Sequence, residues 1–374
     1  MIRFSFERVS QCSAIGASVS STGVSSVEAR TECSKNESPY SIVRMLAIRL
    51  VVVAAGLLTA TGAFSTDAFS ALSPATSASA KLFASHAEHR MAHAGTNAAV
   101  LLTYLEINGW LLSTGGCTIL IDPVLEGALD FGIPTIYSAK KRKLPSTGLC
   151  DELPPIDCLL ITQGLDDHAH TRTLKKLANT LGGDVTVIAP PSAFDALERS
   201  GFDGNGNIRY IKPGGQVTVG GGGGGGDGEE VTIKATTGAL VGPPWQAREN
   251  GYIIRTPSGP SIYIEPHVEY NMKELREEAP VDAVITPISG QGLPAFELVH
   301  GPSDVLRLVQ TLQPRYIIPM QNGDVDAEGL ASSLVQSIGS PGEFRRILSK
   351  AQRPDEHKVE VIDTVPGEII VLEV

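Results

Sequence analysis

Short apolar runs separated by turn residues dominate the chain after about residue 98. The first three runs cover residues 98–105, 110–112 and 118–121, and Asn108-Gly109 and Gly115-Gly116 stand between them. An Asn-Gly pair between two apolar runs is a strong hairpin signal. We therefore predict that the folded body begins with three consecutive strands.

The rest of the body alternates between segments with strand-like and helix-like patterns. Further strands are expected over 158–162, 185–189, 208–211, 216–219, 231–235, 252–255, 261–264, 283–288, 316–320, 359–362 and 368–372, and helices over 171–181, 192–199, 302–312, 327–338 and 343–351. This order predicts an α/β fold in which two sheets pack face to face with helices outside, a four-layer αββα sandwich.

The first 95 residues have the composition of a targeting leader. Arg49 precedes an apolar run and small residues follow as far as Ala63, so residues 45–63 have the layout of a secretory signal peptide. Residues 64–95 are rich in Ser and Ala with few acidic residues, as in a transit peptide. A signal peptide followed by a transit stretch resembles the two-part plastid leader of algae with secondary plastids. We predict a plastid (chloroplast) location, with secretion as the alternative and either Met1 or Met45 as the start.

The predicted globular domain, residues 96–374, is acidic and contains one low-complexity segment. The chain has a net charge of −11, and its first 95 residues carry eight basic and six acidic side chains, so the domain carries −13. Such a domain repels phosphate backbones, which argues against a nucleic-acid partner. Glycine fills positions 220–226, and we expect the loop 220–228 to be an expanded hairpin connection, because glycine cannot bury apolar surface.

The predicted domain contains three cysteines, Cys117, Cys150 and Cys158, without a C-x-x-C spacing. This pattern supports neither a disulfide framework nor a cysteine-based zinc site. The apolar run of the leader is too short for a comfortable membrane span, so we expect no stable membrane anchor in the mature protein. A small-molecule substrate is the expected partner, and the oligomeric state stays open.

The segment Ile161-Thr-Gln-Gly-Leu-Asp-Asp-His-Ala-His170 follows an apolar strand and precedes a helix. It resembles the metal motif of the metallo-β-lactamase superfamily, Thr-His-x-His-x-Asp-His between a strand and a helix. The alignment places Gln163 and Leu165 at the first two histidines of that motif. Asp167 and His168 match its final Asp-His pair.

Other stretches follow the order of the same superfamily. They include the strand 118–122 ending at Asp122, the hairpin of 251–264, and the final helix and strand that lead to Gln321. The resemblance covers residues 98–325 and is greatest to the lactonase-like branch, which includes ascorbate-phosphate lactonases. It implies an αββα sandwich of the metallo-β-lactamase type.

The resemblance also implies a reduced metal centre. The first metal position of the family is lost, because leucine cannot coordinate a metal and no histidine occurs in 235–240. In the second position Asp167 and His168 remain, and His267 replaces the bridging aspartate of the family. One carboxylate, two imidazoles and a water form the donor set of a catalytic zinc site, so we expect one divalent metal, zinc or another.

Further residues receive expected roles from the same alignment. Asp167 and Glu265 are the candidate catalytic groups, with Glu265 as a general base or an additional ligand. Gln163 and Gln321 could hold a water or a substrate oxygen through their amides. In the loop 242–250, Trp245 offers a stacking surface and Arg248 a partner for an anion.

Each residue also has a structural interpretation: Asp167 as a helix cap, His267 as a turn residue, and the Pro-Pro-Trp sequence at 243–245 as loop packing. Two functions therefore stay open. The first is a hydrolase that uses a single divalent metal to activate water against an ester, lactone or phosphoester. The alternative is a metal-free, non-catalytic binding protein that retains the fold and the pocket. Either function predicts that Asp167, His168, His267 and Gln321 converge in one cleft.

Overall fold

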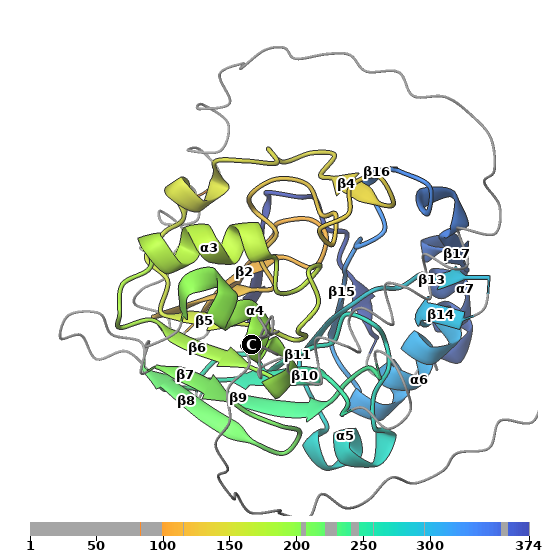
Figure 1. The fold of residues 1–374 in the computed structure, drawn as a ribbon. Helices are drawn as coiled ribbons and strands as arrows, with labels where there is room; N and C mark the ends of the chain where they lie inside the picture. Colours follow the sequence, from red (N-terminus) through yellow and green to blue (C-terminus); the bar gives the residue numbers. More distant parts are fainter. Residues whose placement is uncertain are drawn as a thin grey trace, which may run out of the picture.

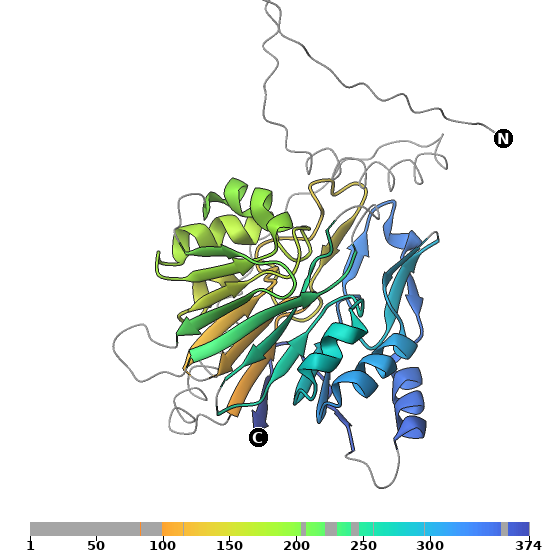
Figure 2. The same ribbon diagram turned by 90° about the horizontal axis from the view of Figure 1, so that it is seen from below.

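Two seven-stranded sheets lie face to face between two layers of helices in the computed structural model of this chain (Figures 1 and 2). The structure describes residues 83, 99–114, 116–202, 207–220, 230–240, 247–256, 258–294, 296–352 and 358–373. The four-layer αββα sandwich expected from the sequence is therefore confirmed.

The first sheet combines an antiparallel half with a parallel half. Its spatial order is β19 (Ile369–Glu373), β1 (Ala99–Tyr104), β2 (Trp110–Thr114), β3 (Cys117–Ile121), β5 (Cys158–Leu160), β6 (Thr186–Ala189) and β7 (Ile208–Tyr210). Strands β19 to β3 are antiparallel, and β3 to β7 are parallel. Because β3, β5 and β6 are parallel, the residues that follow them meet at one edge of the sheet.

The second sheet has the same mixed organisation. Its order is β18 (Glu360–Val361), β15 (Tyr316–Pro319), β12 (Ala283–Thr286), β11 (Ile262–Ile264), β10 (Asn250–Arg255), β9 (Glu230–Thr237) and β8 (Gln216–Gly220). Strands β11, β12, β15 and β18 are parallel, whereas β8 to β11 are antiparallel.

Three hydrophobic layers hold these elements together. Between the sheets, alternate residues of both face one another, for example Leu102 and Ile119 of the first sheet and Ile233 and Tyr252 of the second. The outer face of the first sheet packs against α3 (Thr171–Thr180) and α4 (Phe194–Leu197). The outer face of the second packs against α5 (Met272–Glu278), α6 (Pro302–Leu312) and α7 (Pro341–Ala351).

The predicted helix over 327–338 is wrong. That segment forms β16 (Asp326–Glu328), a short 3-10 turn and β17 (Gln336–Ile338). Gly329 with a φ of 100° interrupts the backbone, and Leu330 is 57% exposed, so no apolar helical face is buried here. Strand β16 pairs with β4 (Ser138–Lys140), and β17 pairs with β13 (Gly290–Leu293).

Other boundaries also differ from the predictions. The expected helix over 192–199 is divided into the 3-10 turn η2 (Pro191–Ala193), α4 and the π-helical turn η3 (Glu198–Phe202). The short elements η1 (Leu149–Glu152) and β14 (Phe296–Val299) and helix α5 had no counterpart in the predicted pattern.

The predicted leader and most of the glycine run lie outside the described residues, apart from two positions. Gly220 ends β8, and Phe83 is buried in the layer that also contains Leu105 and Leu111. Within the described part of the chain, no helix has the length and apolar character needed to cross a membrane.

Candidate metal centre

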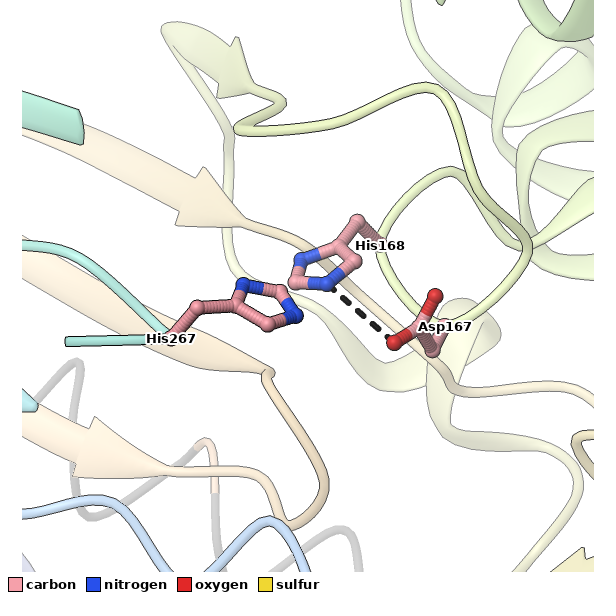
Figure 3. A group of neighbouring side chains, drawn as sticks. All are labelled: Asp167, His168 and His267. Carbon is pink, nitrogen blue, oxygen red and sulfur yellow. Dashed lines mark ion pairs between the residues drawn. The ribbon is translucent and has the colours of Figure 1, made fainter. Parts of the chain in front are cut away.

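Two loops, one from each sheet, bring together the three predicted metal ligands. Asp167 and His168 lie in the turn between β5 of the first sheet and α3, and His267 follows β11 of the second sheet. Each residue offers one ligand atom, and these atoms all lie within 4.8 Å of one another (Figure 3). The rings of His168 and His267 face each other with their centroids 5.2 Å apart.

His168 is held rigidly from behind. Its Nδ1 lies 2.7 Å from Oδ2 of Asp122, which follows β3, and 2.9 Å from the hydroxyl of Thr162, which follows β5. The backbone N–H of Thr162 donates to the other oxygen of Asp122 at 2.8 Å. The imidazole is fully buried. A carboxylate behind the imidazole is the usual support of a metal-binding histidine, because it orients the ring and leaves Nε2 as the ligand.

The other nitrogen of the His168 ring, Nε2, faces a carboxylate and an amide. Nε2 lies 3.2 Å from Oδ2 of Asp167 and 3.2 Å from Nδ2 of Asn108. Burial opposes a charge on this imidazole, but Asp167 and Asp122 outweigh burial and raise the pKa of His168 to about 10. A metal at Nε2 therefore has to displace a proton that two carboxylates stabilise.

His267 has the opposite electrostatic character. Its partial burial and the positive charge of His168 lower the pKa of His267 to about 3. The ring is therefore neutral at physiological pH, which is the form that binds metals. Its Nδ1 lies 2.7 Å from Nε2 of Gln163, the residue at the first histidine of the family motif. Gln163 thus contacts the cluster through His267.

Glu265 lies beside the cluster but does not belong to it. Its Oε2 accepts the backbone N–H of His267 at 3.1 Å and that of Glu269 at 3.0 Å, so it shapes the turn that carries His267. The side chain is fully buried, and burial raises the pKa of Glu265 to about 8. Its Oε1 has no hydrogen-bond partner among the described residues.

Gln321 and Arg248, two other residues predicted for the site, bond to residues outside the three-residue cluster. The backbone N–H of Gln321 donates to the Tyr104 hydroxyl at 3.1 Å, and its side-chain amide donates to Thr364 at 3.1 Å. Arg248 donates to the carbonyl of Gly238 at 3.1 Å and forms an ion pair with Glu269. Trp245 lies outside the described residues.

Two polar residues of this site were not proposed from the sequence as site residues. Asp122 was noted only as the end of a strand, although parallel strands at one edge bring their following residues together. Asn108 belongs to the Asn-Gly hairpin signal, and nothing in that pattern indicates that its side chain reaches His168.

A divalent metal fits the groups that meet here. Asp167 has a side chain 22% exposed, but its Oδ1 is buried and has no hydrogen-bond partner within the described part of the chain. Buried polar atoms usually have partners, so such an atom indicates a missing one. One carboxylate and two imidazoles, one of them supported by Asp122, form a donor set that zinc and related metals accept.

Comparison with known protein families assigns the fold to a class. A family model described as a β-lactamase superfamily domain matches residues 101–321, more than half of the chain. The chain therefore belongs to the metallo-β-lactamase superfamily.

Several individual proteins are similar to this chain. A protein of Anaeromyxobacter dehalogenans (strain 2CP-C) named a UPF0173 metal-dependent hydrolase is 26% identical over 245 residues, covering 63% of this chain and 75% of that protein. A mutant of the CmlA β-hydroxylase has a similar fold, with a TM-score of 0.51, 16% identity, and coverage of 74% of this chain and 54% of that one. Igni18, a metallo hydrolase from Ignicoccus hospitalis, aligns with a TM-score of 0.49 and 19% identity, covering 74% of this chain and 99% of that one.

Proposed function

We propose that this protein is a hydrolase that uses a single divalent metal, zinc or another, held by Asp167, His168 and His267. The observation that carries the proposal is the convergence of these three donor atoms within 4.8 Å from two different sheets. The bacterial relative named a metal-dependent hydrolase supports it. A bound divalent metal supplies an acidified water, with a pKa of about 7, and polarises the oxygen of a carbonyl or phosphoryl group.

Asp167, Gln163 and Glu265 have the remaining roles in the proposed mechanism. Burial opposes a charge on Asp167, but the neighbouring imidazole of His168 outweighs burial and holds the pKa of the Asp167 carboxyl below its usual range. Asp167 is then a carboxylate at neutral pH, with one oxygen free to receive a proton. We assign the amide of Gln163, which lies 2.7 Å from the imidazole of His267, to hold a substrate oxygen. Glu265 fixes the turn of His267, and its carboxyl, with a pKa raised to about 8 by burial, carries a proton at neutral pH that Oε1 could donate.

The proposed substrate is a small molecule with an ester, lactone or phosphoester bond. A panel of simple carboxylic esters, lactones and phosphoesters, tested with Zn²⁺, Mn²⁺ or Co²⁺, checks this. We expect metal-dependent hydrolysis of at least one class, lost on Asp167→Asn. Hydrolysis that survives chelation and this substitution would contradict the mechanism.

The alternative is a binding protein that kept the pocket without the chemistry. Leu165 favours it, because the family has a metal-binding histidine at that position and leucine has no donor atom. A folded wild-type protein that binds neither Zn²⁺, Mn²⁺ nor Co²⁺ would support this alternative.

We also propose that residues 45–63 and the Ser/Ala-rich stretch after Phe64 direct the protein to a plastid. The scarcity of acidic residues in 64–95 supports this proposal, whereas the burial of Phe83 against the domain does not follow from a segment that is removed. N-terminal sequencing of the mature protein from isolated plastids tests this. Secreted protein that begins at Phe64 would contradict it.

A further inference from the structure

We propose that Asn108 is a fourth protein ligand of the metal, through its side-chain oxygen Oδ1. This inference rests on the proposed metal centre and extends it with a residue from a third segment, the hairpin between β1 and β2.

The position of Asn108 is central to the site. Its side chain is 3% exposed, and Nδ2 lies 3.2 Å from Nε2 of His168 and 3.1 Å from the backbone oxygen of Asp167. Its Oδ1 is buried and has no hydrogen-bond partner among the residues that the structure describes. The amide therefore has one end at the proposed ligand atoms and the other end unsatisfied.

Rotation of the amide by about 180° exchanges these two ends, because they have nearly the same shape. A positive group at Nε2 of His168, whether a proton or a metal, attracts the oxygen end of the amide and repels its N–H end. With Asp167 also offering oxygen atoms, the oxygen end of Asn108 is favourable only next to a cation. A metal that replaces the proton on Nε2 of His168 therefore meets the oxygen end of Asn108 as a ligand.

The distances agree with ligands of one metal. Two atoms that each lie about 2.0–2.2 Å from a metal are about 3.0 Å apart at a right angle and about 3.4 Å apart at the tetrahedral angle. Nε2 of His168 lies 3.2 Å from Oδ2 of Asp167 and 3.2 Å from the amide end of Asn108. Both neighbours of Nε2 thus stand at the separation expected of a second ligand.

The hairpin that carries Asn108 is held in an unusual conformation. Glu106 and Ile107 have φ values of 66° and 59°, in the left-handed region that residues other than glycine rarely adopt. The Tyr104 hydroxyl donates to the Ile107 carbonyl at 2.9 Å. Such conformations cluster at functional sites, where the surroundings hold them in place.

A buried carboxylate fixes the hairpin from the other side. Glu106 is 3% exposed and accepts backbone N–H groups from three successive residues, Arg142, Lys143 and Leu144. The effect of these contacts is to hold Asn108 at His168. If Asn108 served only to stabilise the turn of Asp167 and His168 through its N–H groups, its buried Oδ1 would have no role.

Titration of the full chain with Co²⁺ separates the two roles, by chelator competition for affinity and by the visible spectrum for coordination number. If Asn108 is a ligand, Asn108→Ala should weaken Co²⁺ binding about 10-fold or more and intensify the visible bands, because the coordination number falls. Asn108→Asp, which keeps the size and an oxygen, should bind at least as tightly as the wild type. Asn179→Ala, an exposed asparagine on α3 that bonds its own helix, is the control.

The outcomes distinguish this inference from the proposed function. If the wild type binds Co²⁺ and Asn108→Ala binds it with equal or greater affinity and an unchanged spectrum, Asn108 is not a ligand, while the three-residue centre stands. If the folded wild type binds no Co²⁺, both proposals are wrong. Should Asn108→Ala fail to fold, weaker binding by Asn108→Asp than by the wild type would overturn the inference.

Discussion

The imidazole Nδ1 of His168 lies 2.7 Å from the carboxylate of Asp122, and both side chains are buried. Asp122 directly follows β3, and His168 lies in the turn after β5, the neighbouring parallel strand. This pair orients the ring of His168 so that Nε2 faces Asp167 and His267. It is the relationship on which the rest of the proposed centre depends.

Replacement of Asp122 by asparagine should therefore weaken metal binding without removing any ligand. We expect Asp122→Asn to lower the pKa of His168, because one of the two carboxylates that raise it loses its charge. Metal affinity should fall about 10- to 100-fold, the range found when supporting groups behind ligands are changed. NMR titration of His168 and chelator competition measure the two effects, and an unchanged affinity would contradict the proposed support role.

Gly164, within the Asp-His motif, allows a close approach between two loops. A Cβ on this residue would lie 2.2 Å from the backbone oxygen of Ser192. Gly164→Ala should therefore displace the loop and destabilise the fold by about 1–3 kcal/mol. Gly182→Ala is the matched control, since nothing lies within 4 Å of its Cβ position. Equal urea midpoints for both variants would show that the contact is unimportant.

The hydroxyl of Tyr104 connects the Asn108 hairpin to the end of β15. It donates to the Ile107 carbonyl at 2.9 Å and accepts the backbone N–H of Gln321 at 3.1 Å. Tyr104→Phe leaves the buried Ile107 carbonyl and the partly buried N–H of Gln321 without this partner, so we expect a loss of about 1–3 kcal/mol in the free energy of unfolding. Tyr316→Phe, on a partly exposed ring, should change it much less. Urea unfolding of both variants checks this, and similar losses would contradict it.

Lys141 should make stability depend on pH. Its side chain is 7% exposed, its Nζ has no partner among the described residues, and burial lowers its pKa to about 8. The unfolded chain holds this proton up to a pH of about 10.4, so the free energy of unfolding should rise between pH 8 and 10. Below pH 8 the full penalty, about 3 kcal/mol at most, is present.

Lys141→Met provides the comparison for this prediction. It removes the buried amine, so it should stabilise the protein at pH 7, and the difference from the wild type should shrink toward pH 10. A difference that does not change between pH 8 and 10 would show that Lys141 does not titrate as burial requires.

The sequence predicted the sheets better than their surroundings. Apolar runs such as those of β1, β5 and β12 are buried on both faces, so their composition alone marks them as strands. The segment around Leu330 resembled a helix because its apolar residues recur at helical spacing. Those residues contribute little burial, and pairing with β4 and β13 decides the conformation instead.

The candidate site was predictable to the extent that a motif fixes positions in the fold. Asp167, His168 and His267 meet as expected, because the loops that follow β5 and β11 of the two sheets come together. The direction of a side chain is a tertiary property. The side-chain amide of Gln321 donates to Thr364, and the side chain of Asn108 contacts His168 from a hairpin. Neither contact follows from the local spacing of residues in the sequence.

The most direct test of the central claim is the metal stoichiometry of the full chain after loading with Zn²⁺ and removal of excess metal. Elemental analysis should find one metal per chain in the wild type and in His300→Ala, because His300 is not one of the three clustered ligands and its side chain lies beside Glu297 and Asp304. His168→Ala and His267→Ala should both lose the metal while remaining folded. Equal metal content in all four proteins, or none in the wild type, would contradict the proposed centre.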